Sequence, residues 1–230
     1  VIGSHDTDNE TAAFYTEIQC DGRIRVVNWD RVWNASAVRN YGEKYANGEY
    51  ILLLDSDTEI ITPDWVEQML MFAQREDVGA VGAMLYYPDD TVQHGGMIVG
   101  AGIAAEFSHR NYPRNHYGYM GRMAIAQNLS AVSGACMLLR RKVWKEIGGL
   151  EEAFGSAFGD LDLCMRIRKA GYWIVWTPFA ELYHHEVKSL DQETNPKSNR
   201  YLIRDARLFQ KRWAKELAQG DPFYNPNIKL

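Results

Sequence analysis

Short apolar runs separated by amphipathic segments dominate the pattern of this 230-residue chain. Tyr50–Leu54 and Val78–Leu85 are continuous apolar runs, which are typical of strands buried on both faces. Between them, we expect Thr62 to cap a helix that has Pro63 at its first position and runs to about Arg75. This alternation predicts an α/β fold, with a largely parallel sheet covered by helices on both sides.

The other segments continue the alternation. They predict a capping box at Thr7–Glu10 opening a helix to about 19, a strand at 23–28, a helix at 36–46, an apolar run at 132–139, helices at 142–147 and 160–170, strands at 173–176 and 180–184, and a helix at 198–217. Residues 86–130 are rich in glycine, so we expect loops over a site with one or two strands. The last helix places Leu202, Phe209 and Trp213 on one face, as a docking helix would.

Composition narrows the function classes. The formal net charge is −5 and the chain lacks a basic stripe, which argues against nucleic acid as a partner. The cysteines Cys20, Cys136 and Cys164 are widely spaced, and we expect buried thiols rather than disulfides. The apolar run Met97–Ala105 is too short to cross a bilayer, and we expect no signal peptide because Val1 opens directly into sequence that looks folded. We expect a cytoplasmic protein, for which peripheral contact at the inner face of the membrane stays open.

The most informative polar residues follow the run Tyr50–Leu54. Asp55 and Asp57 are separated by one residue where a buried strand ends, and ligands of α/β sheets gather at such ends. Two carboxylates held this close are unfavourable unless a cation neutralises them, and Mg²⁺ or Mn²⁺ suits oxygen ligands. The alternative is a simple acidic turn before the next helix.

Three longer segments carry a resemblance to a known family. GEYILLLDSDTEI, SGACMLLRRKVWKEIGGLEE and FGDLDLCMRIRKAGYWIVWTPFAELYHHE occur in this order and resemble family 2 glycosyltransferases of bacterial polysaccharide and O-antigen synthesis. The resemblance implies a GT-A type of α/β fold. It also implies inverting transfer of a sugar from a nucleoside-diphosphate sugar donor to a saccharide or lipid-linked acceptor.

By the same resemblance, the donor site contains Asp55, Ser56 and Asp57. Asp57 is the direct ligand of Mn²⁺ or Mg²⁺, and Asp55 acts toward the ribose and the water shell of the metal. His184 completes the metal shell, and a core or surface histidine is the alternative. Neighbouring residues of a strand face opposite ways, so His185 is not expected to reach the same ion.

The resemblance places the catalytic base at Asp160, which would take the proton of the acceptor hydroxyl. Members of the family have two adjacent acidic residues at this point, but the first of the two positions is Gly159 here. The alternative role for Asp160 is to cap the helix that follows it. Asp162 and Arg166 are four residues apart and can pair on one helix face. The alternative interpretation is that Asp162 and Arg166 contact the sugar or the acceptor.

Two further motifs have open interpretations. Gln93-His94-Gly95-Gly96 recurs in the O-antigen type of these enzymes, where His94 either faces donor or acceptor or belongs to a turn held by glycines. Gly134 and Ala135 precede a buried run. Their small side chains permit close approach of a sugar or tight packing.

The start of the chain departs from the resemblance. Family members begin with a strand like VSIIIPTYN, whereas residues 1–8 match only the end of the second strand, and Gly3 stands where an acidic residue recognises the base. We therefore expect an N-terminally truncated nucleotide pocket. The expected division is a catalytic domain at 1–195, with a nucleotide and metal half to about 95 and an acceptor half from 96, and a helix and tail at 196–230.

Two alternatives to a transferase stay open at this point. One is a catalytically silent sugar- or nucleotide-binding module, or an inactive fragment of such an enzyme, which the altered N-terminal part favours. The other is a metal-dependent hydrolase that uses the same carboxylates, although the ligand set is rich in oxygen and holds one histidine at most.

Overall fold

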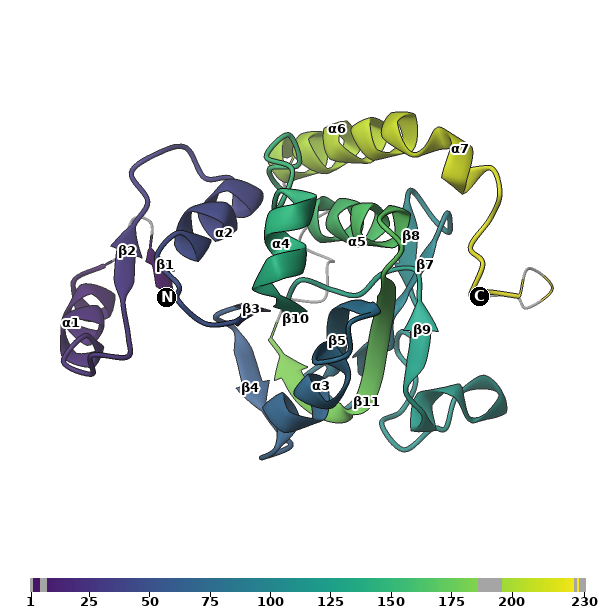
Figure 1. Ribbon diagram of the computed structural model, residues 1–230, viewed down its shortest axis with the longest axis horizontal. Coiled ribbons are helices and arrows are strands. Elements are labelled where there is room, and N and C mark those ends of the chain that lie inside the picture. The colour runs from purple at the N-terminus through teal and green to yellow at the C-terminus, as the bar shows by residue number, and fades with distance from the viewer. Residues whose placement is uncertain (1, 5–7, 186–195, 226, 228–230) are drawn as a thin grey trace.

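The computed structural model describes residues 2–4, 8–185, 196–225 and 227, which form a mixture of strands and helices (Figure 1). The strands are β1 (Ile2–Ser4), β2 (Val26–Asn28), β3 (Tyr50–Leu54), β4 (Thr58–Ile60), β5 (Val78–Tyr86), β6 (Val92–His94), β7 (Met97–Val99), β8 (Ala105–Phe107), β9 (Gln127–Leu129), β10 (Cys136–Arg140) and β11 (Trp173–His184). The helices are α1 (Asn9–Ile18), α2 (Ala35–Glu43), α3 (Trp65–Ala73), α4 (Arg141–Ile147), α5 (Gly159–Lys169), α6 (Pro196–Arg212) and α7 (Ala214–Leu217), with a 3₁₀ helix η1 (Tyr119–Ala124).

Seven strands form the central sheet. β3, β10, β5, β11 and β4 follow one another across it, while β6 pairs with β5 and β9 pairs with β11. Among these described strands only β5 and β11 run parallel, so the expectation of a largely parallel sheet is wrong. A continuous apolar run indicates burial on both faces, and an antiparallel strand in the middle of a helix-covered sheet needs the same residues.

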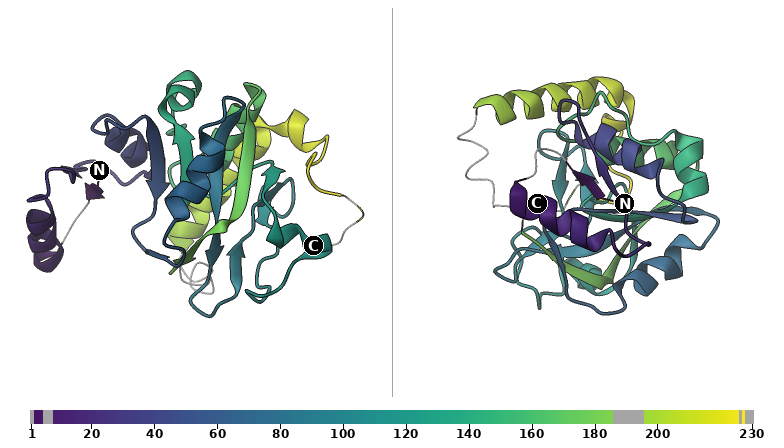
Figure 2. Two further views of the ribbon diagram at one scale, coloured as in Figure 1. Left: turned by 60° about the horizontal axis from the view of Figure 1, so that its bottom comes forward. Right: turned by 90° about the vertical axis from the view of Figure 1, so that its left-hand side faces the viewer.

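The strands of this sheet bury side chains on both of its faces. In β10, Met137 and Leu139 join a cluster that includes side chains of α4 and α5, whereas Cys136 and Leu138 join a second cluster with α3. This alternation follows the period of two in a strand. Figures 1 and 2 show the same layers, with α4 and α5 on one side of the sheet and α3 on the other. The α/β class is therefore confirmed.

β11 is a single long strand where two strands were expected. Its register with β5 shifts between Trp176 and Glu181, and Pro178 lies inside this irregular stretch. A proline lacks the N–H that a ladder needs, so it is tolerated where the regular pairing lapses. The strand therefore continues past Pro178 and ends at His184.

The N-terminal residues form a separate small unit, in which β1 and β2 pair in parallel beside α1 (Figure 1). Asp8 caps α1, because its side chain accepts a hydrogen bond from the Thr11 N–H at 2.7 Å. Thr7, the expected cap, lies outside the described residues. Cys20 follows α1 and is exposed, which corrects the expectation of three buried thiols. α1 contains no buried residue, so the helix that precedes Cys20 does not bring it into a core.

Two helix boundaries differ from expectation. α3 begins after Asp64, and the Thr62 hydroxyl instead accepts a hydrogen bond from the Glu181 N–H of β11. The long C-terminal helix breaks at Trp213, which separates α6 from α7. Its docking face is nevertheless present, because Phe209 is fully buried and Trp213 is nearly so.

Candidate active site

The pairing of β4 with β11 brings together a candidate metal cluster, which consists of Asp55, Asp57 and His184. β4 follows the turn that contains Asp55 and Asp57, and its Thr58 pairs with His184. As a result, the Nε2 atom of His184 lies 3.2 Å from Oδ1 of Asp57 and 3.9 Å from Oδ2 of Asp55. One ligand atom from each residue lies within 4.8 Å of the others. The structure therefore brings together the three residues that the sequence assigned to the metal.

The chemistry of this donor set fits a divalent cation. Ligands about 2.1 Å from an octahedral Mg²⁺ lie about 3 Å from their neighbours. The 3.2 Å between the His184 and Asp57 atoms is close to this value, whereas the Asp55 atom lies farther off, at 3.9 Å from His184. Oxygen donors with one imidazole suit Mg²⁺ or Mn²⁺. His184 is buried, whereas the Asp55 and Asp57 side chains are 35% and 47% exposed. The cluster thus opens to solvent on its carboxylate side, where a ligand of the cation can enter.

His185 does not take part in this cluster. Its Nε2 lies 3.1 Å from Oε2 of Glu59, and both side chains are largely exposed. Its backbone N–H donates to the Asp57 carbonyl at 2.8 Å and so closes the turn against the strand.

Arg39 is a site residue that the sequence reasoning missed. It lies in α2, and its Nη2 is 2.5 Å from Oδ1 of Asp55. The guanidinium adds a positive charge beside the two carboxylates and lowers the repulsion between them. Its spacing of three from the buried Ser36 places it on the inner face of α2, a signal that could have identified it.

Asp160 lies at the first turn of α5, next to Gly134. Its Oδ2 accepts a hydrogen bond from the Gly134 N–H at 2.8 Å, and its Oδ1 accepts one from the Leu161 N–H at 2.8 Å. These bonds fix the orientation of the carboxylate, but Asp160 is not the N-cap of α5, which is Phe158.

Gly134 lies between Arg39, which contacts Asp55, and Asp160. A Cβ at this position would lie 2.9 Å from Nη1 of Arg39 and 3.1 Å from Cβ of Asp160. Glycine therefore allows Arg39 and Asp160 to approach each other, and Arg39 in turn contacts Asp55. The Arg39 side chain therefore lies between Asp160 and the cluster of Asp55, Asp57 and His184. Ala135 is buried, and its carbonyl accepts the Asp55 N–H at 3.0 Å.

The absence of an acidic side chain at Gly159 has a steric explanation. A Cβ there would lie 2.5 Å from the Ser36 hydroxyl, which donates to the Phe154 carbonyl at 2.6 Å. The space that the family's first acidic residue would need is therefore occupied by α2. This departure leaves the position of Asp160 intact.

Asp162 and Arg166 form the expected helix-face pair, with Nε of Arg166 2.7 Å from Oδ2 of Asp162. Asp162 is fully buried, and its Oδ1 also accepts from the Trp213 indole N–H at 3.0 Å and lies 3.2 Å from Nε of Arg212. These bonds tie α5 to the end of α6. The structure does not bring Asp162 into the metal cluster.

His94 is buried and bonded on both ring nitrogens. Its Nδ1 lies 3.3 Å from the Ala83 carbonyl, and its Nε2 accepts the Ser133 N–H at 3.1 Å. Burial lowers the pKa of His94 to about 4, with a smaller contribution from His184, so the ring is neutral near pH 7.

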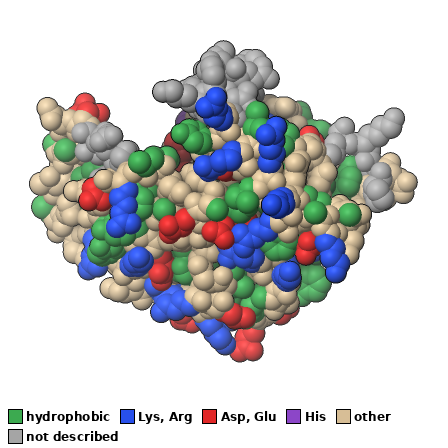
Figure 3. All heavy atoms as spheres, turned by 90° about the horizontal axis from the view of Figure 1, so that it is seen from above, with side chains coloured by type: hydrophobic (Ala, Val, Ile, Leu, Met, Phe, Trp, Pro, Cys, Tyr) green, Lys and Arg blue, Asp and Glu red, His purple; other side chains and the backbone are tan. Residues whose placement is uncertain are grey.

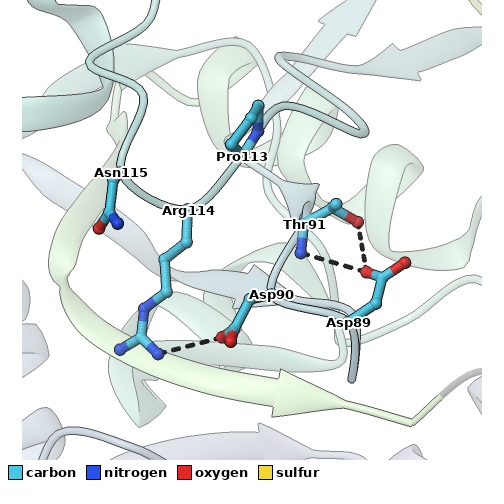
Figure 4. A pocket seen from close by; sticks show the side chains of 6 residues that line it. All are labelled: Asp89, Asp90, Thr91, Pro113, Arg114 and Asn115. Carbon is cyan, nitrogen blue, oxygen red and sulfur yellow. Dashed lines mark hydrogen bonds and ion pairs between the residues drawn. The ribbon is translucent and has the colours of Figure 1, made fainter.

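Other polar features lie apart from this cluster. One pocket is lined by Asp89, Asp90, Thr91, Pro113, Arg114 and Asn115 (Figure 4). In it Arg114 pairs with Asp90 and with Glu181, so its charge is already neutralised within the fold. Burial raises the pKa of the Cys136 and Cys164 thiols to about 12, which makes them poor nucleophiles.

The surface charge and the helices add two observations. On the face in Figure 3, acidic and basic side chains are interspersed. Among residues 2–4, 8–185, 196–225 and 227, none of the helices has the length and apolar character that a bilayer span requires.

The fold and this cluster together define a class. The sequence matches the family described as "Glycosyltransferase like family 2" over residues 1–206. The chain therefore belongs to this glycosyltransferase-like family, as its motifs indicated.

Curated relatives agree with this membership. The chain is 41% identical over 232 residues to the uncharacterized protein y4gI of Sinorhizobium fredii, with 100% of this chain and 25% of the relative covered. It is 33% identical over 231 residues to the O-antigen biosynthesis protein RfbC of Myxococcus xanthus, covering 100% of this chain and 18% of that protein. The chain thus spans a quarter or less of these two relatives.

Solved structures confirm the GT-A fold. The mannosyltransferase PcManGT from Pyrobaculum calidifontis, in complex with GDP-Man and Mn²⁺, superposes with a TM-score of 0.60 at 15% identity, covering 94% of this chain and 52% of that one. GalNAc-T7 with UDP, GalNAc and Mn²⁺ gives a TM-score of 0.63 at 14% identity, covering 94% and 42%.

The neutral state of His94 predicts a pH dependence of stability. The folded pKa of about 4 lies below the ordinary value of 6.5, so the unfolded chain binds more protons between these pH values. We expect the free energy of unfolding to fall as the pH drops from about 6.5 to about 4, with this residue contributing up to about 3 kcal/mol. In urea unfolding without metal, the stability advantage of wild type over His94→Gln should narrow in this window. An advantage independent of pH would contradict the prediction.

Proposed function

We propose that this chain provides the metal and catalytic residues of an inverting glycosyltransferase. It would move a sugar from a nucleoside-diphosphate sugar to a saccharide or lipid-linked acceptor in the synthesis of cell-surface polysaccharide. The convergence of Asp55, Asp57 and His184 on one point is the observation that carries the proposal. Family membership and the name of the O-antigen relative support the reaction class and the pathway type.

The donor side of the site is built by the turn after β3. Asp57 and His184 would hold Mn²⁺ or Mg²⁺ directly, and Asp55 would contact the ribose and the water shell, with Ser56 exposed between them. When bound, the cation offsets the charge that develops on the leaving nucleoside diphosphate. Arg39, which pairs with Asp55, supplies a positive charge beside the site, and its guanidinium would be suited to pair with a diphosphate oxygen.

The acceptor side contains Asp160. Its carboxylate would take the proton of the acceptor hydroxyl while that oxygen bonds to the anomeric carbon and the bond to the diphosphate breaks. Its backbone bonds to Gly134 and Leu161 hold it in place for this step. Asp162, the nearest carboxylate along α5, is buried and paired, so it is unsuited to act as a covalent nucleophile. Direct displacement with inversion is therefore the mechanism we favour.

The division of labour along the chain is part of the proposal. Residues 1–95 would hold the nucleotide and metal, residues 96–195 the acceptor, and residues 196–230 would dock against the domain through Phe209 and Trp213. We place the reaction in the cytoplasm or at the inner face of the membrane, where lipid-linked acceptors would be available.

Replacement of Asp57 tests the metal site. Asp57→Ala should weaken Mn²⁺-dependent binding of nucleoside diphosphates at least about 10-fold, since loss even of groups that support a ligand costs that much. Calorimetry with UDP, dTDP and GDP, with Mn²⁺ or EDTA, measures it. Glu59→Ala is the matched control, because Glu59 is exposed and faces His185. Wild-type affinity in Asp57→Ala would contradict the assignment.

Replacement of Asp160 tests the base. Asp160→Asn should leave Mn²⁺-dependent donor binding largely intact and lower turnover by roughly 10²- to 10⁴-fold, because the amide cannot accept the proton. Sugar transfer or donor hydrolysis with UDP-, dTDP- and GDP-sugars measures the rate. Asp77→Asn, which alters an exposed carboxylate paired with Arg75, should behave as wild type. Normal turnover in Asp160→Asn would refute the base assignment, and a chain that binds donor without any turnover would instead be a silent binding module.

A further inference from the structure

The Gln93-His94 motif has a structural environment that the proposed function does not yet explain. Both side chains are about 1% exposed and come from β6, an edge strand that pairs with β5. Adjacent residues of a strand point to opposite sides. Gln93 accordingly reaches His184, whereas His94 reaches the backbone at Ser133.

Gln93 contacts His184 twice. Its Oε1 lies 2.7 Å from Nδ1 of His184, and its Nε2 lies 3.5 Å from the carbonyl oxygen of the same residue. The second contact sets the direction of the amide, because the reverse orientation would place two carbonyl oxygens against each other. An amide oxygen only accepts hydrogen bonds, so Nδ1 of His184 must carry the proton.

This protonation has a consequence at the other ring nitrogen. A neutral His184 with its proton on Nδ1 presents an unprotonated Nε2 to Asp57 and Asp55. Three hydrogen-bond acceptors, Nε2 and the two carboxylates, then face one another. This arrangement is unfavourable without a cation, and it should therefore bind a cation strongly. The orientation of the metal ligand therefore depends on Gln93.

His94 acts on the other half of the site. Its Nε2 holds the Ser133 N–H, and the next two residues contact the catalytic groups, with the Gly134 N–H on Asp160 and the Ala135 carbonyl on the Asp55 N–H. Its Nδ1 is anchored on the Ala83 carbonyl of β5. The segment Ser133–Ala135 is thus fixed to the central sheet through the His94 ring.

We propose that Gln93 and His94 are the positioning residues of this site, with Gln93 setting the tautomer of the metal ligand His184 and His94 holding the segment that orients Asp160. The inference rests on the proposed function for what the site does. The tautomers, however, are properties of the metal-free protein and can be measured independently of any activity.

The first test needs no variant of Gln93. In metal-free chain labelled with ¹⁵N-histidine at pH 8, long-range ¹H–¹⁵N NMR should show the proton of both His184 and His94 on Nδ1. Signals are assigned with His184→Asn and His94→Gln. A His184 ring whose Nδ1 carries no proton would overturn the role of Gln93, whatever the chain catalyses.

The second test titrates Mn²⁺ alone by calorimetry. Gln93→Glu keeps an acceptor for the Nδ1 proton and should bind Mn²⁺ at least as tightly as wild type, whereas Gln93→Met should bind about 10- to 100-fold more weakly. Gln127→Met is the matched control, since Gln127 lies in β9 and bonds to the Arg122 carbonyl. Equal affinity of Gln93→Met and wild type overturns the inference. A wild-type chain that binds no Mn²⁺ contradicts the proposed function instead, and the NMR result then decides the inference.

The third test separates the two residues. At saturating Mn²⁺, His94→Leu should lower the kcat of donor hydrolysis about 10- to 100-fold through displacement of Asp160, with an Mn²⁺ affinity within about 3-fold of wild type. Gln93→Met should show the opposite pattern, with a shift in the Mn²⁺ requirement and recovery of kcat at high Mn²⁺. An unchanged kcat in His94→Leu would overturn the role of His94.

Discussion

The antiparallel pairing of β4 with β11 is the interaction on which the site depends. It aligns Thr58 with His184 and is extended by the bond from the His185 N–H to the Asp57 carbonyl. Two carboxylates and an imidazole are thereby held at one edge of the sheet, although their mutual repulsion opposes this arrangement. β5 and most of β10 are buried, and β11 buries Ala180, Leu182 and His184 on its way to the site. The packing of these strands supplies the rigidity that keeps the three groups together.

The other half of the site depends on the C-terminal helix. The buried carboxylate of Asp205 in α6 accepts the N–H groups of Ser156 and Ala157, and Phe209 packs against Phe158. Phe158 has a φ of 63°, an unfavourable conformation for a bulky residue, and it directly precedes Gly159 and Asp160. The helix α6 therefore holds a strained loop in the shape that presents Asp160, which gives the docking face a catalytic purpose within the proposed function.

Much of this arrangement could be predicted from local pattern, and the rest depends on tertiary contacts. The apolar run Tyr50–Leu54 matches β3 because turn residues bound it on both sides, and the following Asp55 and Asp57 belong to the turn as expected. The predicted direction of the strands was wrong because burial on both faces requires the same apolar residues in parallel and in antiparallel strands. Arg39 and Gln93 were missed as contacts because their partners lie 16 and 91 positions away along the chain, beyond the reach of any local pattern.

The most direct test of the central claim is a crystal structure of the chain grown with Mn²⁺ and a nucleoside diphosphate, with anomalous scattering recorded at the manganese edge. The account predicts one strong peak within coordination distance of Asp57 and Nε2 of His184, in contact with the diphosphate. A peak held by other residues, or a bound diphosphate with no manganese beside Asp57 and His184, would contradict it.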